Sequence, residues 1–263
     1  SNALSRLREK FNDDLFIRTG SGMVPTQKTE NIIKDIQNAL SLMQLSVNEP
    51  DTFDPKISKR TFKLSLGDVS EGRVLPFIMN EIDKKASSVA LGSYAYSRSD
   101  QVHALATNNL DFVVDPVIPV SDEIDSFKVF EDDWVAMHRD GHQLADIENI
   151  TIEDILNQRH LHVSNRRRGL HLIDLELDKI GYRREVALRC QHFLIAPQIL
   201  RSTDLVLMGT RSFAIANNLS FIEVPIEIPS MEYFLIWHKS DEGDGGHLWM
   251  KDLIIKAFID AKK

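Results

Sequence analysis

The sequence contains a single cysteine, Cys190, so an intramolecular disulfide is excluded. The fold must depend on ordinary packing, as is typical of proteins in a reducing compartment. No segment approaches the roughly 18 consecutive apolar residues that a membrane-spanning helix requires, and no charged leader followed by an apolar run opens the chain. We therefore expect a cytoplasmic protein with no membrane partner.

The chain also lacks the basic excess that is typical of nucleic-acid-binding proteins. It has 31 Lys and Arg residues against 39 Asp and Glu residues, for a formal net charge of −8. Residues 1–48 hold six basic and five acidic side chains, so the acidic excess lies entirely in residues 49–263. Any contact with DNA should therefore be confined to the N-terminal part.

Motifs that carry catalysis are missing from the sequence. It contains no G-x-S-x-G, no P-loop and no G-x-G-x-x-G, and Gly20-Ser21-Gly22 does not match the last of these. Nine histidines suggest a metal site, and His160 and His162 share one face of an expected strand, but no H-E-x-x-H or C-x-x-C spacing occurs. We expect no enzyme activity, no metal and no cofactor.

Residues 4–26 have the pattern of a helix followed by a hairpin. Leu4, Leu7 and Phe11 have helical spacing, and a turn, a short apolar strand and a Gly-Ser-Gly turn follow them. Taken alone, this pattern fits a fragment of any small domain.

The spacings L-x-x-L-R, D-x-LF-x-R-T-G, G-M and PT in this segment resemble the second half of the winged helix-turn-helix of LysR-type transcriptional regulators. The resemblance implies a recognition helix that runs into Leu4–Lys10, packing by Leu15 and Phe16, a wing over Arg18–Met23, and phosphate contacts by Arg6, Arg8, Arg18 and Lys28. The front of the recognition helix has no counterpart here, and Ser1-Asn2-Ala3 is typical of an expression scar. We therefore expect specific DNA binding from the full-length protein only.

A long helix is expected over residues 27–47. Its apolar row steps by four and three residues in turn, close to the 3.5-residue period of a coiled coil, through Thr29, Ile33, Ile36, Leu40, Met43 and Val47. Either the helix packs on its own domain or it pairs with a second subunit. The polar linker that follows, Ser46–Pro55, favours pairing through Ile33, Ile36, Leu40 and Met43, and the resemblance places the family's linker helix here.

Strands and helices alternate in residues 60–263, which predicts parallel sheets covered by helices. Strands are expected at 62–66, 89–92, 111–114, 134–138, 160–164, 184–190 and 231–238, and helices at 70–85, 100–108, 152–157, 170–180 and 248–261. Thr151 begins a capping box and Gly181 a C-cap. Pro76 lies inside an expected helix, which should start later or kink there.

The alternation, with matching residues at 60–78, 110–116, 186–209 and 234–238, resembles the two-lobed, type 2 periplasmic-binding-protein-like sensing domain of LysR regulators, in particular the nodulation-regulator-like branch. The implied architecture is α/β. Lobe 1 comprises about 60–136 and 229–263, and lobe 2 comprises about 137–228.

Ligands of such folds bind in the crevice at the carboxyl ends of the strands, where helices begin. Three loops meet this description, and they offer Asp68, Val69 and Ser70; Asn165 and Arg166; and His192 and Phe193. Simpler roles stay open: Asp68 or Ser70 as an N-cap, the arginines as a solvated turn, and His192 as a buried structural residue. The arginine loop would suit an organic acid.

We therefore expect a ligand-responsive transcriptional regulator that forms a homodimer or a homotetramer. Two other classes share parts of this pattern. A solute-binding protein of a transporter has the same fold but needs an export signal and has no wing motif. An α/β enzyme needs a nucleophile or a metal motif, and neither was found in the sequence.

Overall fold

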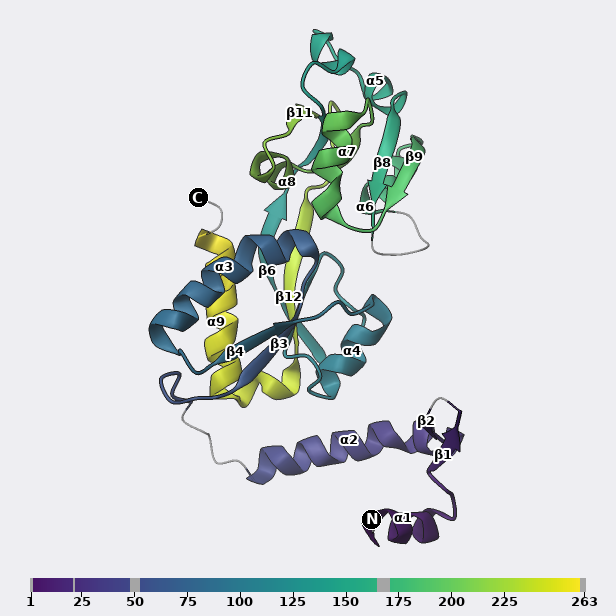
Figure 1. The fold of residues 1–263 in the computed structure, drawn as a ribbon, viewed down its shortest axis with the longest axis vertical. Helices are drawn as coiled ribbons and strands as arrows, with labels where there is room; N and C mark the ends of the chain where they lie inside the picture. Colours follow the sequence, from purple (N-terminus) through teal and green to yellow (C-terminus); the bar gives the residue numbers. More distant parts are fainter. Residues whose placement is uncertain (1, 21, 48–52, 165–170, 261–263) are drawn as a thin grey trace.

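The computed structural model describes residues 2–20, 22–47, 53–164 and 171–260 (Figure 1). The N-terminal segment forms the expected helix, hairpin and long helix: α1 (Asn2–Phe11), β1 (Phe16–Thr19), β2 (Gly22–Pro25) and α2 (Gln27–Val47). Leu15 is buried, and its carbonyl accepts hydrogen bonds from the Thr26 N–H and the Thr29 hydroxyl, which fixes the start of α2. Of the two residues expected to pack this segment, Leu15 is buried, whereas Phe16 is 36% exposed in this chain.

The apolar row of α2 changes character along the helix. Thr29 is buried against the loop that precedes the hairpin, and Ile33 is half-buried. Ile36 and Leu40 are 38% and 54% exposed in the single chain. The side chain of Met43 lies outside the described residues. Pairing of two subunits through this row stays a prediction. It requires apolar side chains that are exposed in the single chain, as Ile36 and Leu40 are.

The first lobe is built on a five-stranded sheet with strand order β4-β3-β5-β12-β6. Its strands are β3 (Thr61–Ser65), β4 (Ala90–Ser93), β5 (Phe112–Asp115), β6 (Ile124–Asp132) and β12 (Met231–His238). The first three are parallel, and β12 runs antiparallel to both β5 and β6. The alternation of apolar and polar residues did not predict β6, because this edge strand exposes one face and its sequence is interrupted by charged residues.

Helices cover both faces of this sheet: α3 (Asp68–Lys85), α4 (Arg98–Ala106) and α9 (Gly245–Asp260). Phe112 and Val114 of β5 belong to the core formed with α3 and α9, whereas Val113 between them belongs to the core formed with α4. Burial of the sheet on both sides explains why β5 is an unbroken apolar run. A parallel sheet in this lobe was therefore predicted correctly, with β6 and β12 added antiparallel.

Helix α3 begins at Asp68 and continues through Pro76, so the later start considered for it was wrong. A proline inside a helix costs about 3 kcal/mol because it removes a hydrogen bond and crowds the preceding turn. Val74, Ile78 and Ile82 are at most 1% exposed on the face that packs on the sheet. Burial of three such side chains contributes about 1.5–3 kcal/mol each, which outweighs the local cost.

The second lobe contains the sheet β10-β7-β11 and the parallel pair β8-β9, joined by a bridge between His160 and Val206. Its strands are β7 (Trp134–His138), β8 (Arg159–Val163), β9 (Glu185–Cys190), β10 (Leu207–Thr210) and β11 (Ser220–Glu223). Its helices are α5 (Ile152–Leu156), α6 (Leu172–Lys179), α7 (Ala196–Ser202) and α8 (Arg211–Ala216), with short 3-10 turns at Gln143–Asp146 and Phe193–Ile195. A third 3-10 turn, Lys239–Gly243, precedes α9.

Local signals in the second lobe are confirmed in detail. Thr151 and Asp154 form the expected capping box of α5, and Gly181 adopts a φ of +83° after α6. Strand β9 lies within the expected range 184–190, and its register with β8 shifts between His160 and Leu161. This irregularity leaves Leu188 39% exposed.

The chain crosses between the lobes twice, and the two crossings lie side by side. The first is at Asp133, between β6 and β7, and the second precedes β12. The Trp134 indole N–H donates to the Pro229 carbonyl at 3.1 Å, and the Ser230 hydroxyl donates to Asp133 at 2.7 Å. Because β7 pairs with β10 and β11, residues 134–136 belong to the second lobe and not, as expected, to the first.

Candidate binding cavity between the two lobes

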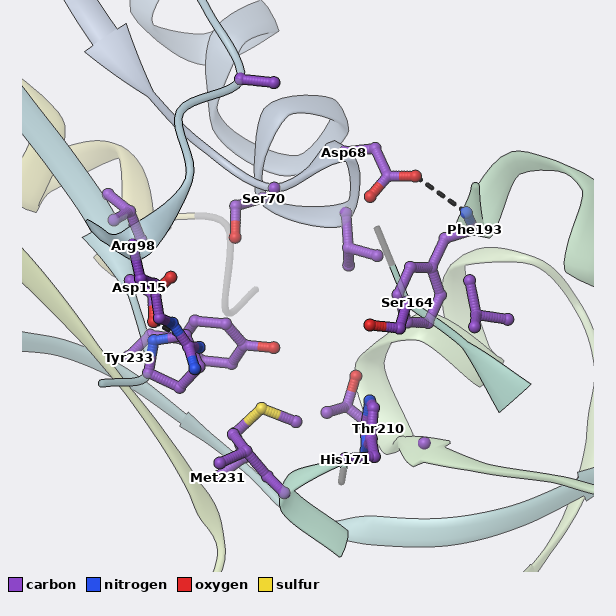
Figure 2. Close-up of a pocket in the computed structure, with 18 of the residues that line it drawn as sticks. Asp68, Ser70, Arg98, Asp115, Ser164, His171, Phe193, Thr210, Met231 and Tyr233 are labelled. Atoms are coloured by element: carbon purple, nitrogen blue, oxygen red, sulfur yellow. Dashed lines mark hydrogen bonds and ion pairs between the residues drawn. The ribbon is translucent and has the colours of Figure 1, made fainter. Parts of the chain in front are cut away.

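A cavity of about 750 Å³ lies between the lobes (Figure 2), which is within the usual size of a small-molecule site. The first lobe lines it with Gly67, Asp68, Val69, Ser70, Ala95, Tyr96, Ser97, Arg98, Ser99, Val114, Asp115, Pro116, Met231 and Tyr233. The second lobe adds Trp134, Val163, Ser164, His171, Leu172, Gln191, Phe193, Gly209 and Thr210. Most of these residues follow the carboxyl ends of strands, where this fold places its crevice.

The first turn of α3 forms one wall of the cavity. Ser70 is buried, and its side chain is directed into the cavity (Figure 2). Asp68 turns toward the second lobe, where its Oδ2 accepts a hydrogen bond from the Phe193 N–H at 2.8 Å. The N-cap residue of α3 is Gly67, so neither Asp68 nor Ser70 has the simple capping role that was considered.

The first lobe also contributes an ion pair, in which Arg98 Nη2 lies 2.5 Å from Asp115 Oδ1. Tyr233 lies on the same side of the cavity, and its hydroxyl points inward (Figure 2). Burial, together with the nearby carboxylates of Asp132 and Asp115, raises the pKa of Tyr233 above its ordinary value. The phenol therefore stays protonated and can donate a hydrogen bond to a ligand.

On the opposite side of the cavity lie His171 and Thr210 of the second lobe (Figure 2). The His171 ring makes edge contacts with Trp134 and His162, with centroids 5.8 and 5.3 Å away. Burial, followed by the positive charge of Arg184 and the contact with His162, lowers the pKa of His171 to about 4. His171 is therefore neutral at physiological pH in the ligand-free protein.

A buried ion pair between Arg184 and Asp174 lies next to His171. Arg184, with a side chain only 2% exposed, places Nε 2.6 Å from Asp174 Oδ1. The other carboxylate oxygen of Asp174, Oδ2, accepts a hydrogen bond from the backbone N–H of His171 at 3.2 Å. The Nδ1 of His162 lies 3.7 Å from the same oxygen. These contacts fix the position of His171 at the start of α6.

The structure brings together part of the site expected from the sequence. Asp68, Val69, Ser70 and Phe193 line the cavity. His192 precedes the 3-10 turn that begins at Phe193; it is exposed and is not among the lining residues. Asn165 and Arg166 lie outside the described residues.

The polar cavity residues that sequence reasoning missed include Arg98, His171, Thr210 and Tyr233. A signal was available for Arg98, which begins the helix after strand β4, the same kind of position that identified Ser70. Tyr233 lies near the start of an antiparallel strand, a position that the carboxyl-end rule does not cover.

Metal binding finds no support in the described part of the chain, where no group of three His, Cys, Asp or Glu side chains is arranged to hold an ion. Within the same residues, no helix is both long and apolar enough to span a membrane.

A two-lobed α/β domain with a small-molecule cavity between its lobes is the architecture of a ligand-sensing domain. Residues 58–258 match the LysR substrate binding domain, which covers both lobes. The chain therefore belongs to the LysR family of transcriptional regulators.

Relatives agree over nearly the whole chain. The transcriptional activators NagR of Ralstonia sp. and NahR of Pseudomonas putida are each 26% identical, with 99% of this chain and 88% of each relative aligned. Nodulation protein D 1 of Bradyrhizobium sp. (strain NC92) is 27% identical over 97% of this chain and 82% of its own length. These matches confirm the expected branch and extend through the N-terminal segment.

Solved structures show the same fold. A probable transcriptional regulator from Pseudomonas aeruginosa is 31% identical, with a TM-score of 0.70 over 96% of this chain and 86% of its own. A full-length OxyR variant from Pseudomonas aeruginosa has a TM-score of 0.74 at 12% identity, over 98% of this chain and 83% of its own. The effector binding domain of QuiR, solved in complex with shikimate, has a TM-score of 0.64 at 13% identity, over 77% of this chain and 99% of its own.

Proposed function

We propose that this LysR-type regulator responds to a small organic acid that binds in the cavity between its lobes. The observation that carries the proposal is the cavity itself, whose wall comes from both lobes and combines apolar side chains with Ser70, Arg98, His171 and Tyr233. Family membership favours a ligand-responsive regulator over the solute-binding protein considered as an alternative. The shikimate complex of QuiR supports the ligand class, since shikimate is a hydroxylated carboxylic acid.

The ligand would act by stabilising one arrangement of the lobes. A molecule that contacts Ser70 on one side and Phe193 on the other binds more tightly when the two walls are close. The difference in affinity between the two arrangements sets how far the population can shift. No covalent step is needed, which agrees with the lack of catalytic motifs in the sequence.

The remaining roles follow the family. LysR-type regulators bind DNA, respond to small molecules and form oligomers. For this chain we propose DNA contacts by Arg6, Arg8, Arg18 and Lys28, and subunit pairing through α2 into a homodimer or a homotetramer. A cytoplasmic location and the lack of any catalysed reaction remain predictions.

A thermal-shift screen of organic acids, followed by calorimetry, tests the ligand site. A ligand at 100 times its dissociation constant stabilises the folded state by about 2.7 kcal/mol. Ser70→Ala and Phe193→Ala should each weaken binding, and Asn165→Ala tests the loop outside the described residues. His192→Ala is the matched control, because it neighbours Phe193 but does not line the cavity. Wild-type affinity in both Ser70→Ala and Phe193→Ala would exclude this cavity as the site.

A further inference from the structure

We propose that the carboxylate of the effector binds between Arg98 of the first lobe and His171 of the second. This assignment rests on the proposed function, and it names the two side chains that read the charge of the ligand. Both residues line the cavity, and they face each other from opposite sides (Figure 2).

Arg98 keeps hydrogen-bonding capacity after it has paired with Asp115. Its Nη2 is 2.5 Å from Asp115 Oδ1, and that oxygen is itself held by the Val117 N–H at 2.8 Å. The Arg98 Nε is buried and has no hydrogen-bond partner among the described residues. A buried donor without a partner is costly, so a ligand oxygen that accepts from Arg98 removes an existing penalty.

His171 is in a similar state on the other wall. Its Nδ1 is buried and lies toward the Asp174 N–H in the capping box that begins α6, without a well-formed hydrogen bond among the described residues. Its backbone N–H donates to Asp174, which fixes the backbone of His171 at the start of α6. A ligand that spans the cavity can therefore satisfy side chains of both lobes at once, which is what links binding to lobe arrangement.

Four charged groups lie around His171, and each of the two arginines among them is paired with a carboxylate: Arg184 with Asp174, and Arg98 with Asp115. Arg184 and Asp174 form a pair behind the ring, His162 contacts its edge, and Arg98 faces it across the cavity. Burial opposes protonation of His171 in the free protein, and the positive charges of Arg184 and, less strongly, Arg98 add to the effect. A carboxylate placed between Arg98 and His171 opposes the effect of these positive charges and raises the pKa of His171 from about 4.

Binding should therefore be accompanied by proton uptake at His171. The free imidazole is neutral above about pH 4, and the complex holds a proton up to the raised pKa. Affinity for a carboxylate then rises as the pH falls toward about 5 from neutrality. A histidine with only a structural role would not produce this dependence.

The test compares three acids, benzoate, para-hydroxybenzoate and shikimate, with their primary amides, which have nearly the same shape but no charge. Calorimetry should show tighter binding of the acids in the wild type. Arg98→Gln and His171→Gln should each reduce acid affinity by about ten- to a hundredfold and change amide affinity little. Ser70→Ala should weaken acid and amide alike, and His192→Ala should weaken neither.

Titrations at about pH 6 in two buffers of different ionisation enthalpy count the protons taken up. The wild type should show net proton uptake with each acid, and His171→Gln should not. Amides that bind as tightly as the acids, or variants that weaken both equally, would overturn the assignment while the cavity remains the ligand site. If no acid or amide binds, the proposed function fails, and this assignment fails with it.

Discussion

Asp68 of the first lobe accepts a hydrogen bond from the backbone N–H of Phe193 in the second lobe, with 2.8 Å between Oδ2 and N. Asp68 begins α3, and Phe193 begins the turn that leads into α7. Both residues line the cavity. Because its donor and acceptor lie on different lobes, this bond exists only while the two walls of the cavity are close.

Removing this bond should favour separation of the lobes. A hydrogen bond to a charged group contributes about 1.5–3 kcal/mol when buried, and less here because Asp68 is exposed. Asp68→Ala should increase the radius of gyration of the ligand-free protein in small-angle scattering and weaken effector binding several-fold. Asp68→Asn keeps an acceptor and should have a smaller effect. Identical scattering for all three proteins would show that the bond does not hold the lobes together.

Pairing through α2 can be tested on its exposed apolar row. Ile36→Asp combined with Leu40→Asp would place two carboxylates in the seam, where unpaired charges cost several kcal/mol. Sedimentation should then show a dissociation constant raised by about two orders of magnitude. Asn31→Asp with Asn38→Asp adds the same charge at exposed positions off the row and should leave the oligomer intact. An unchanged oligomer in the first double variant would refute the seam.

Acid should destabilise the fold between about pH 6.5 and pH 4. Burial lowers the pKa of His160, His162, His171 and His247 from 6.5 to about 4. In this window the unfolded chain binds more protons than the folded chain, so stability is present above 6.5 and is lost as the pH falls toward 4. Each histidine contributes up to about 1.4 kcal/mol per pH unit.

Asp241 works in the opposite direction. Burial and the nearby carboxylate of Asp111 raise its pKa to about 6, so the folded state gains a proton there. One such group cannot offset the four histidines. Urea unfolding at several pH values should show a falling midpoint on acidification, with a smaller slope in His160→Gln. A midpoint independent of pH over this range would contradict the proposed burial of these rings.

Contacts with DNA should be confined to the N-terminal segment. Arg6 and Arg18 are exposed, whereas Arg8 and Lys28 donate to the backbone carbonyls of Asp14 and Phe11 at 2.7 and 2.6 Å. Arg6→Ala and Arg18→Ala should therefore weaken binding to any duplex and reduce the salt dependence by about 0.9 per lost phosphate contact. Anisotropy titrations at several salt concentrations measure this slope.

Arg189→Ala provides the control for this experiment, because Arg189 is an exposed arginine on β9 of the second lobe. If that variant lowers the slope as much as Arg6→Ala does, the acidic sensing domain also touches DNA. Tight, sequence-selective binding by residues 1–263 at physiological salt would contradict the expectation that these residues make only phosphate contacts.

Local chemistry explains which parts of the fold were predictable. The capping box at Thr151, the left-handed Gly181 and the alternating apolar residues of β3 depend on neighbours in the sequence, so they could be read directly. Helix α3 was harder because Pro76 opposes it locally, and the burial that sustains it comes from the sheet and from α9.

The cavity was less predictable because its polar residues come from distant elements. Ser70 and Phe193 follow strands of the parallel units, and the carboxyl-end rule found them. The turn between β9 and α7 determines which of two adjacent residues faces the cavity. Here Phe193 lines the cavity and His192 does not. Tyr233 enters the site only because β12 returns from the second lobe to pair with β5.

Strand β12 also has a consequence for biosynthesis. It lies between β5 and β6 in the sheet, although the whole second lobe is made after those two strands and before β12. The second lobe is continuous from β7 to β11, so it has all its strands before β12 leaves the ribosome. We expect the lobe synthesised second to fold first, while the first lobe waits for its missing strand and α9. Proteolysis of chains ending at residue 228 should accordingly spare residues 134–223 and degrade those that precede them.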